Sequence, residues 1–326
     1  MSRLIAVTDS VFPDLSPVQT ILSKIGGEVR LAKAPTPEAI LEVAREAEAV
    51  LTTYAKITAD MIAQMKRCRI IARFGIGVDN VDIPAATKAG IVVTRVPDYC
   101  LDEVSDHAMA LLLALVRKIP SSNARTQAGA WEMKAVVPIH RLRGTVLGLV
   151  GFGQIPRLVA PRAQAFGMRV VTYDPYVPPE IAKSERVEQM EFDELIRISD
   201  YISIHTPLLP ATRHLFNADV FRRMKPAAYL INTARGPIID EAALAEALDQ
   251  KQIAGAALDV LEQEPPGASR LFGRENVIIT PHTGYYSEES LVDLQHKAAQ
   301  EVLRVLSGEA PRNPLNPEVL KTARAT

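Results

Sequence analysis

Short apolar runs rich in valine, isoleucine and alanine alternate with longer helical stretches from one end of the chain to the other. In the first third of the chain, five such runs occupy residues 4–8, 28–31, 49–52, 70–73 and 92–94. Apolar runs of this length between helices are typical of strands in a parallel sheet that is covered on both faces. The pattern predicts a small doubly wound α/β unit here.

A second series of strands follows a long apolar helix that we predict over residues 103–119. After a polar loop with the single tryptophan, Trp131, six further runs occupy residues 146–150, 169–173, 201–205, 228–232, 255–260 and 277–280. Six strands suit a dinucleotide-binding sheet. A last helix should begin after Ser287, a good N-cap, end near Gly308, and pack back on the first unit. The predicted fold is α/β, with two doubly wound parallel-sheet domains.

Composition narrows the class of protein. The 326 residues are 48% apolar and 23% charged, as in an ordinary two-domain globular chain. With 37 basic and 38 acidic residues, the chain has no overall electrostatic field that would favour binding to nucleic acid or to an anionic membrane. We find no apolar run long enough for a membrane span or a signal peptide. Cys68 and Cys100 have no metal-ligand or disulfide pattern, so we expect free thiols, no metal site and a cytoplasmic location.

A glycine-rich segment after the run 146–150 indicates a nucleotide site. It reads Gly151-Phe-Gly153-Gln154-Ile155-Pro156, and the next run ends at Asp174. Glycines allow the backbone to approach a pyrophosphate, whose charge meets free N–H groups at a helix N-terminus. Asp174 can accept a hydrogen bond from a ribose 2′-OH and would repel a 2′-phosphate, so NAD is favoured over NADP. An ordinary strand-to-helix turn is the alternative, and the spacing of Asp174 argues against it.

Two prolines depart from the usual form of this segment. Pro156 replaces the third small residue, but the first helical turn tolerates proline because its N–H groups are unpaired. Pro161 falls inside the same predicted helix, where a proline removes a hydrogen bond. We predict a kink there.

Three polar residues follow three of the predicted strands: Arg235, Glu264 and His282. Ligands of open α/β sheets bind at the carboxyl ends of strands, so these side chains can converge. Arginine suits a carboxylate and can polarise a carbonyl, and histidine titrates near neutrality. Glu264 would orient the imidazole and hold it charged. Each residue alone is more often an ordinary surface or structural residue, but together, after a nucleotide loop, they predict an active site.

The chain resembles the D-isomer-specific 2-hydroxyacid dehydrogenases over nearly its whole length. The resemblance is carried by five motifs in the family's order: Arg73-Phe-Gly-Ile-Gly-Val-Asp-Asn-Val-Asp82, Gly151-Phe-Gly-Gln-Ile155, Asn232-Thr-Ala-Arg-Gly236, Leu258-Asp-Val-Leu-Glu-Gln-Glu-Pro265 and Thr280-Pro-His282. Three shorter motifs look most like the C-terminal binding protein branch, whose animal members are NADH-linked corepressors: Val96-Pro-Asp-Tyr99, Asp174-Pro-Tyr176 and His282-Thr-Gly-Tyr-Tyr-Ser287.

The resemblance implies a flavodoxin-like substrate domain formed by residues 1–100 and 288–326, with a Rossmann NAD-binding domain, residues 101–287, inserted in it and the active site in the cleft. It assigns the substrate carboxylate and carbonyl to Arg235, acid/base work to His282 and the support of that histidine to Glu264. Backbone N–H groups of Gly75, Ile76, Gly77 and Val78 would bind the carboxylate. Implied cofactor contacts, besides Gly151 and Gly153, are Gln154, Ile155, Asp174, Pro207, Thr212, Thr233, Ala234, Asp259 and Gly284.

The predicted activity is reversible hydride transfer between NAD(H) and a 2-oxo/2-hydroxy acid. Formate oxidation releases no hydroxyl proton and needs no ionisable Glu–His pair, so Glu264 favours a hydroxy acid. The alternative is an NADH-sensing, corepressor-like protein with little turnover, which the lack of long disordered extensions disfavours.

We expect no nucleic-acid or membrane partner. The family also implies a homodimer, packed partly through residues 103–119. His107, on that helix, is expected to be structural, and His205 to lie on the adenine side.

Overall fold

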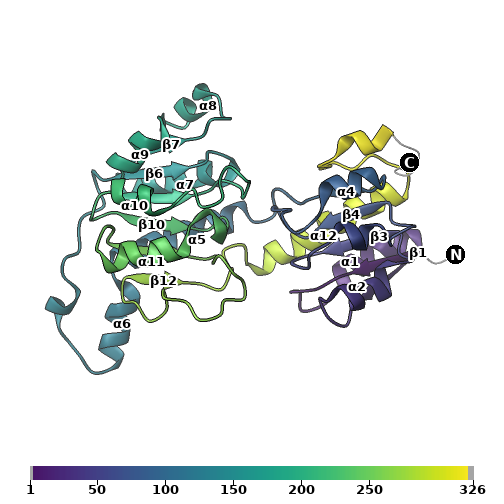
Figure 1. Cartoon of the computed structure of the whole chain (residues 1–326), viewed down its shortest axis with the longest axis horizontal. Helices are drawn as coiled ribbons and strands as arrows, with labels where there is room; N and C mark the ends of the chain where they lie inside the picture. Colours follow the sequence, from purple (N-terminus) through teal and green to yellow (C-terminus); the bar gives the residue numbers. More distant parts are fainter. Residues whose placement is uncertain (1–2, 322–326) are drawn as a thin grey trace. The chain divides into compact units, whose positions relative to one another are not determined.

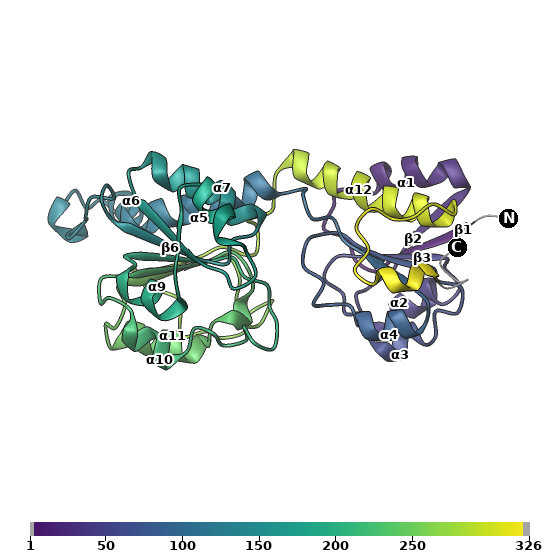
Figure 2. The same cartoon turned by 90° about the horizontal axis from the view of Figure 1, so that it is seen from above.

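The computed structural model describes residues 3–321 and consists of two compact units. One unit combines Met1–Tyr99 with Ser287–Thr326, and the other is Cys100–Tyr286. Each unit has its own parallel sheet with helices on both faces (Figures 1 and 2). Both cysteines, Cys68 and Cys100, are buried and belong to no disulfide bond, as predicted. Across residues 3–321, every helix is too short or too polar to cross a lipid bilayer.

The sheet of the first unit has the strand order β2-β1-β3-β4-β5. Its strands are β1 (Arg3–Val7), β2 (Gly27–Leu31), β3 (Ala49–Thr52), β4 (Ile70–Arg73) and β5 (Val92–Thr94). One face is covered by α1 (Ser16–Leu22) and α12 (Glu288–Leu306), and the other by α2 (Pro37–Ala44), α3 (Ala59–Ile62) and α4 (Ile83–Lys88) (Figure 2). Because both faces are covered, β3 and β4 are buried along their whole length, which explains their continuous apolar pattern.

Helix α12 returns the chain to the first unit, as predicted. It begins after Ser287, whose hydroxyl accepts a hydrogen bond from the Ser290 N–H, while the Ser290 hydroxyl accepts one from the Ser287 N–H. Its buried face packs on α1 and β4. Beyond it, the Asn316 side chain binds the backbone of Ile91 and Val93 beside β5, so residues far apart in sequence complete this unit.

The second unit has a parallel sheet in the order β12-β11-β10-β9-β6-β7-β8. Its strands are β6 (Val146–Val150), β7 (Arg169–Tyr173), β8 (Glu188–Gln189), β9 (Tyr201–Ile204), β10 (Tyr229–Asn232), β11 (Gly255–Leu258) and β12 (Val277–Ile279). Figure 2 shows α5 (Leu101–Val116) and α7 (Gln154–Ala165) on one face, and α9 (Phe192–Ile198), α10 (Ala218–Arg223) and α11 (Glu241–Asp249) on the other. The remaining helices are α6 (Ile119–Gln127) and α8 (Pro179–Ser184), with 3₁₀ turns at Ser23–Ile25, Met133–Val136, Gly236–Ile238 and Pro317–Lys321.

The predicted α/β class with two parallel sheets is confirmed, and two details differ. The second sheet has seven strands instead of six, because β8 is a two-residue edge strand of polar residues that leaves no apolar run. The helix predicted over 103–119 is α5, which ends at Val116; Lys118 then adopts a left-handed conformation, φ 54°, before α6 begins. Helix α7 continues through Pro161 as one element, and the kink expected there stays a prediction.

Gly148 in β6 gives a test of the packing beneath the nucleotide loop. A Cβ atom there would lie 2.4 Å from the Ser199 hydroxyl and 2.7 Å from a Leu195 methyl group. Gly148→Ala should therefore lower the free energy of unfolding by about 1–3 kcal/mol, measured by urea denaturation. Gly267→Ala is the control, since a Cβ there meets no atom within 4 Å; we expect a change of less than about 0.5 kcal/mol. Equal effects of the two substitutions would contradict the packing argument.

Candidate active site

The segment after β6 forms a tight loop at the carboxyl end of the sheet. Gly151 has φ +96°, and a Cβ atom there would lie 2.9 Å from the carbonyl group of His205, so this position requires glycine. The Phe152 N–H donates to one oxygen of Asp174 at 2.8 Å, and the Tyr176 N–H donates to the other at 2.9 Å. Asp174 thus holds the loop against the end of β7, where the sequence predicted it.

Helix α7 begins directly after this loop and presents its N-terminus there. Gly153 is the N-cap and supplies no side chain to the first-turn N–H groups of Gln154 and Ile155. A Cβ at Gly153 would have no neighbour within 4 Å, so the outer side of the loop is open. Pro156 is buried in the first turn, as its sequence position allowed. The open glycine loop and the first-turn N–H groups of α7 therefore suit the binding of a dinucleotide pyrophosphate.

His205 lies behind the same loop. Its Nε2 is 2.9 Å from the Ser203 hydroxyl, and desolvation by the surrounding protein lowers the pKa of the imidazole to about 3. The loop that follows brings together Pro207 and Thr212, two predicted cofactor contacts, because the Thr212 hydroxyl donates to the Pro207 carbonyl at 2.6 Å. His205 is therefore a half-buried, neutral support for this end of the sheet.

The segment after β10 is folded by the side chain of Asn232, which is completely buried. Its Oδ1 accepts from the Ala234 N–H and its Nδ2 donates to the Arg235 carbonyl, both at 2.9 Å. Among the residues described, the buried hydroxyl of Thr233 has no hydrogen-bond partner. A buried unpaired hydroxyl is costly, and a polar group of a bound cofactor would satisfy it, which agrees with the predicted contact.

Neighbouring strands place the remaining predicted residues along one edge. Strands β10, β11 and β12 are consecutive in the sheet, so the segments that carry Arg235, Glu264 and His282 leave it side by side. Gly236 lies so close to the Leu261 backbone that a Cβ would fall 1.9 Å from the Leu261 carbonyl oxygen. The backbone beside Arg235 therefore packs directly against the segment that leads to Glu264.

Glu264 and His282, which the sequence predicted as an acid/base pair, lie in direct contact. One oxygen of Glu264 lies 2.7 Å from His282 Nδ1, and the other accepts from the Leu261 N–H at 3.0 Å. A carboxylate only accepts hydrogen bonds, so this contact favours the tautomer with its proton on Nδ1 and leaves Nε2 without a bond to Glu264. The His282 side chain is 23% exposed, so small molecules can reach it. Its ring also meets Tyr285 edge-on at 6.1 Å between centroids.

Asp259 fixes the backbone that carries His282. Its carbonyl accepts from the His282 N–H at 2.8 Å, and its carboxylate accepts from the N–H groups of Thr283 at 2.9 Å and Gly284 at 2.8 Å. His282 adopts a left-handed conformation, φ 54°, which is unusual for a residue with a side chain. Three consecutive amides held by one residue account for the persistence of this conformation.

The Asp259 carboxylate remains ionised in spite of its burial. Desolvation opposes ionisation, but hydrogen bonds from His107, Thr280 and the N–H groups of Thr283 and Gly284 outweigh it and lower the pKa of the carboxyl group below its ordinary value. Sequence reasoning missed Thr280 and expected His107 to be structural only. A threonine directly before Pro-His was the available signal.

The predicted carboxylate loop, Gly75 to Val78, follows β4 in the other unit. Gly75 has φ +144°, and a Cβ there would fall 1.0 Å from the Arg73 guanidinium, so the arginine occupies the space that a side chain would need. The Val96 N–H donates to the Gly75 carbonyl at 3.0 Å and holds the loop beside β5. Ile76, Gly77 and Val78 are half-buried in this loop.

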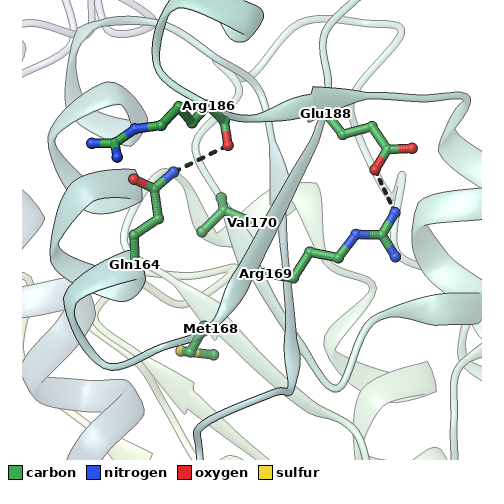
Figure 3. Close-up of a pocket in the computed structure, with 6 residues that line it drawn as sticks. All are labelled: Gln164, Met168, Arg169, Val170, Arg186 and Glu188. Carbon is green, nitrogen blue, oxygen red and sulfur yellow. Dashed lines mark hydrogen bonds and ion pairs between the residues drawn. The ribbon is translucent and has the colours of Figure 1, made fainter.

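A separate hollow of about 310 Å³ lies away from these residues, at the amino end of β7 beside β8 (Figure 3). There, the Gln164 side chain donates to the Arg186 carbonyl at 3.2 Å, and Arg169 pairs with Glu188. Since ligands of parallel sheets bind at the carboxyl ends of strands, this hollow is not the predicted site.

Comparison with known proteins defines the class. The model of the D-isomer specific 2-hydroxyacid dehydrogenase, NAD binding domain, matches residues 109–284. D-3-phosphoglycerate dehydrogenase of Methanocaldococcus jannaschii is 40% identical over 96% of this chain, and glyoxylate reductase of Thermococcus litoralis is 38% identical over 89% of this chain and 90% of its own length. The structure of Aquifex aeolicus D-lactate dehydrogenase, complexed with NAD and lactic acid, covers 97% of both chains with a TM-score of 0.85 and 28% identity.

The chain therefore belongs to the D-isomer-specific 2-hydroxyacid dehydrogenase family, and its second unit contains the NAD-binding domain. It spans 59% of the length of the M. jannaschii phosphoglycerate dehydrogenase. The predicted NAD cofactor agrees with this family. The relatives named here support a dehydrogenase, and they give no support to the corepressor alternative.

The low pKa of His205 predicts a specific pH dependence of stability. Between pH 6.5 and about 3, the unfolded chain binds a proton at His205 and the folded chain does not, so stability falls as the pH decreases in this interval. The loss is about 1.4 kcal/mol for each pH unit. In His205→Gln, the difference in unfolding free energy between pH 7 and pH 5 should be smaller by about 2 kcal/mol, measured by urea denaturation. Parallel pH dependences of the two proteins would contradict the assignment.

Proposed function

We propose that this protein is an NAD-dependent dehydrogenase that interconverts a 2-oxo acid and a D-2-hydroxy acid. The observation that carries the proposal is the Glu264–His282 pair, 2.7 Å apart, at the carboxyl edge of an NAD-binding sheet. A hydroxyl that is oxidised to a carbonyl must lose a proton as well as a hydride, and a supported imidazole can take it. The relatives, named phosphoglycerate dehydrogenase, glyoxylate reductase and lactate dehydrogenase, all carry names of 2-hydroxy acid enzymes.

In the reductive direction, bound NADH would supply the hydride for the carbonyl carbon of the substrate. His282 Nε2 donates a proton to the carbonyl oxygen, and Glu264 stabilises the charged imidazole from Nδ1. Arg235 binds the substrate carboxylate and polarises the carbonyl. In oxidation, neutral His282 accepts the proton instead.

We assign the cofactor to the second unit, through Gly151, Gly153, Gln154, Ile155 and Asp174 at the loop, and through Pro207, Thr212, Thr233, Ala234, Asp259 and Gly284 farther along the sheet edge. In the first unit, residues 1–100 and 288–326 in our assignment, the N–H groups of Gly75, Ile76, Gly77 and Val78 would bind the substrate carboxylate, and the NAD-binding unit is residues 101–287. A cytoplasmic location agrees with the two buried cysteines, which form no disulfide bond.

His282→Ala should lower kcat for reduction of 2-oxo acids by about 10²–10⁴-fold, because the positioned proton donor is lost. A panel of glyoxylate, pyruvate and phosphohydroxypyruvate, followed by NADH absorbance, measures this rate. NADH affinity, measured by fluorescence titration, should change little. His296→Ala, at an exposed histidine of α12, is the control and should retain the wild-type rate. Wild-type activity in His282→Ala would refute the assigned role, and tight NADH binding without turnover on the whole panel would favour the corepressor-like alternative.

We also propose a homodimer built through α5 and the segment that follows it. Residues 119–137 carry an unusual share of exposed apolar side chains: Ile119 (56%), Trp131 (90%), Met133 (77%) and Val137 (56%). Figure 1 shows this segment, with α6, projecting from the body of its unit. Exposed apolar surface of this kind is typical of a protein–protein interface, and a second copy would cover it in a two-fold arrangement.

Replacing Trp131 and Met133 together by glutamate should produce a monomer, because two charges would be buried in the interface. Sedimentation equilibrium of the wild type and the double variant measures the mass. Val292→Glu, at an apolar side chain of α12 that is 45% exposed, is the control and should keep the wild-type mass. A monomeric wild-type protein would refute the proposal.

A further inference from the structure

A chain of hydrogen bonds links helix α5 to the backbone of His282. His107, in the first half of α5, places its Nε2 3.0 Å from the Thr280 hydroxyl and 3.3 Å from Asp259 Oδ1. The Thr280 hydroxyl lies 2.6 Å from that same Asp259 oxygen. The three side chains therefore form a triangle between α5, β11 and β12. The Asp259 side chain is only 3% exposed, so water contributes little to its solvation.

The distances determine where the protons lie. The ionised Asp259 carboxylate cannot donate, so the single hydroxyl proton of Thr280 must point to it across 2.6 Å. The Thr280 oxygen can then only accept from His107, which requires a proton on Nε2. With the opposite tautomer, the unprotonated Nε2 would face a carboxylate oxygen at 3.3 Å, and two acceptors would repel each other in a region of low dielectric constant.

This triangle bears on the catalytic histidine through Asp259. The oxygen that meets His107 and Thr280 also accepts from the Thr283 N–H at 2.9 Å, and the Asp259 carbonyl accepts from the His282 N–H. At Gly284, a Cβ would lie 2.8 Å from the Asp259 carboxylate and 3.2 Å from the His107 ring, so the loop, the carboxylate and the imidazole are packed in contact. A rotation of Asp259 would release the amides that keep His282 in its left-handed conformation.

We propose that His107 is a positioning residue for the reaction: its Nε2–H, donated to Thr280 and Asp259, locks the Asp259 carboxylate and thereby the backbone of His282. The catalytic consequence rests on the proposed function, whereas the tautomer and the rigidity of the loop do not. His107 does not act on substrate in this proposal.

Two measurements test the proposal and do not depend on catalytic activity. In ¹⁵N NMR spectra at neutral pH, Nε2 of His107 should show the chemical shift of a protonated ring nitrogen, and an unprotonated Nε2 would overturn the proposal. In hydrogen exchange, residues 282–284 should exchange about tenfold faster in His107→Leu than in the wild type, because the lock on Asp259 is lost. His107→Gln, whose amide can donate in place of Nε2–H, should restore slow exchange in this loop.

The kinetic test separates positioning from general stability. His107→Leu and Thr280→Val should each lower kcat about tenfold, and the double variant should be no slower than either one, because both break the same chain. His107→Gln should recover most of the rate. Asp106→Ala, which removes the neighbouring surface ion pair with Arg162 on the same helix, is the control and should leave loop exchange and kcat unchanged.

Additive losses in the double variant, or equal exchange in His107→Leu and the wild type, would overturn the proposal. If the wild-type protein reduces no 2-oxo acid, the proposed function fails, and the NMR and exchange results still decide the role of His107.

Discussion

A buried carboxylate stays ionised only while hydrogen-bond donors surround it, and Asp259 meets this condition by tying together the parts of the candidate site. Its donors come from α5, from the end of β12 and from the loop beyond that strand. The same residue accepts from the His282 N–H through its carbonyl. The loss of any donor would leave charge unsolvated in the interior, so the geometry around His282 is coupled to the stability of the strand ends beneath it.

The histidines of the second unit show that environment, and not residue type, decides the role of an imidazole. His205 is half-buried, and the loss of hydration lowers the pKa of its imidazole to about 3, so the ring is neutral near neutral pH. His282 is partly exposed and faces Glu264, as the proposed acid/base role requires. His107 meets an already saturated carboxylate through a threonine, an arrangement that holds a proton in place. A further histidine, His214, pairs with Glu262 at 2.6 Å in the segment that leads to Glu264.

Close backbone approaches position the rest of the site, and glycines make these approaches possible. Gly236 brings the segment of Arg235 against Leu261, and Gly151 brings the nucleotide loop against the segment of His205. In the first unit, Gly75 leaves room for the Arg73 guanidinium under the loop predicted to bind a carboxylate. Each loop therefore rests on the closely packed core of its own unit, which provides the rigid support that the proposed hydride-transfer reaction requires.

The sequence by itself determined the two parallel sheets, nearly all of their strands, the nucleotide loop and the family, because buried parallel strands leave continuous apolar runs and close backbone contacts demand glycine at fixed spacings. It also predicted Glu264 and His282 as a pair, which the structure places 2.7 Å apart. It did not reveal β8, whose two polar residues carry no periodic signal. Nor could it give the left-handed backbone of His282 or the contacts of His107 and Thr280 with Asp259. These features arise where α5, β11 and β12 meet, so only the packing of residues distant in sequence decides them.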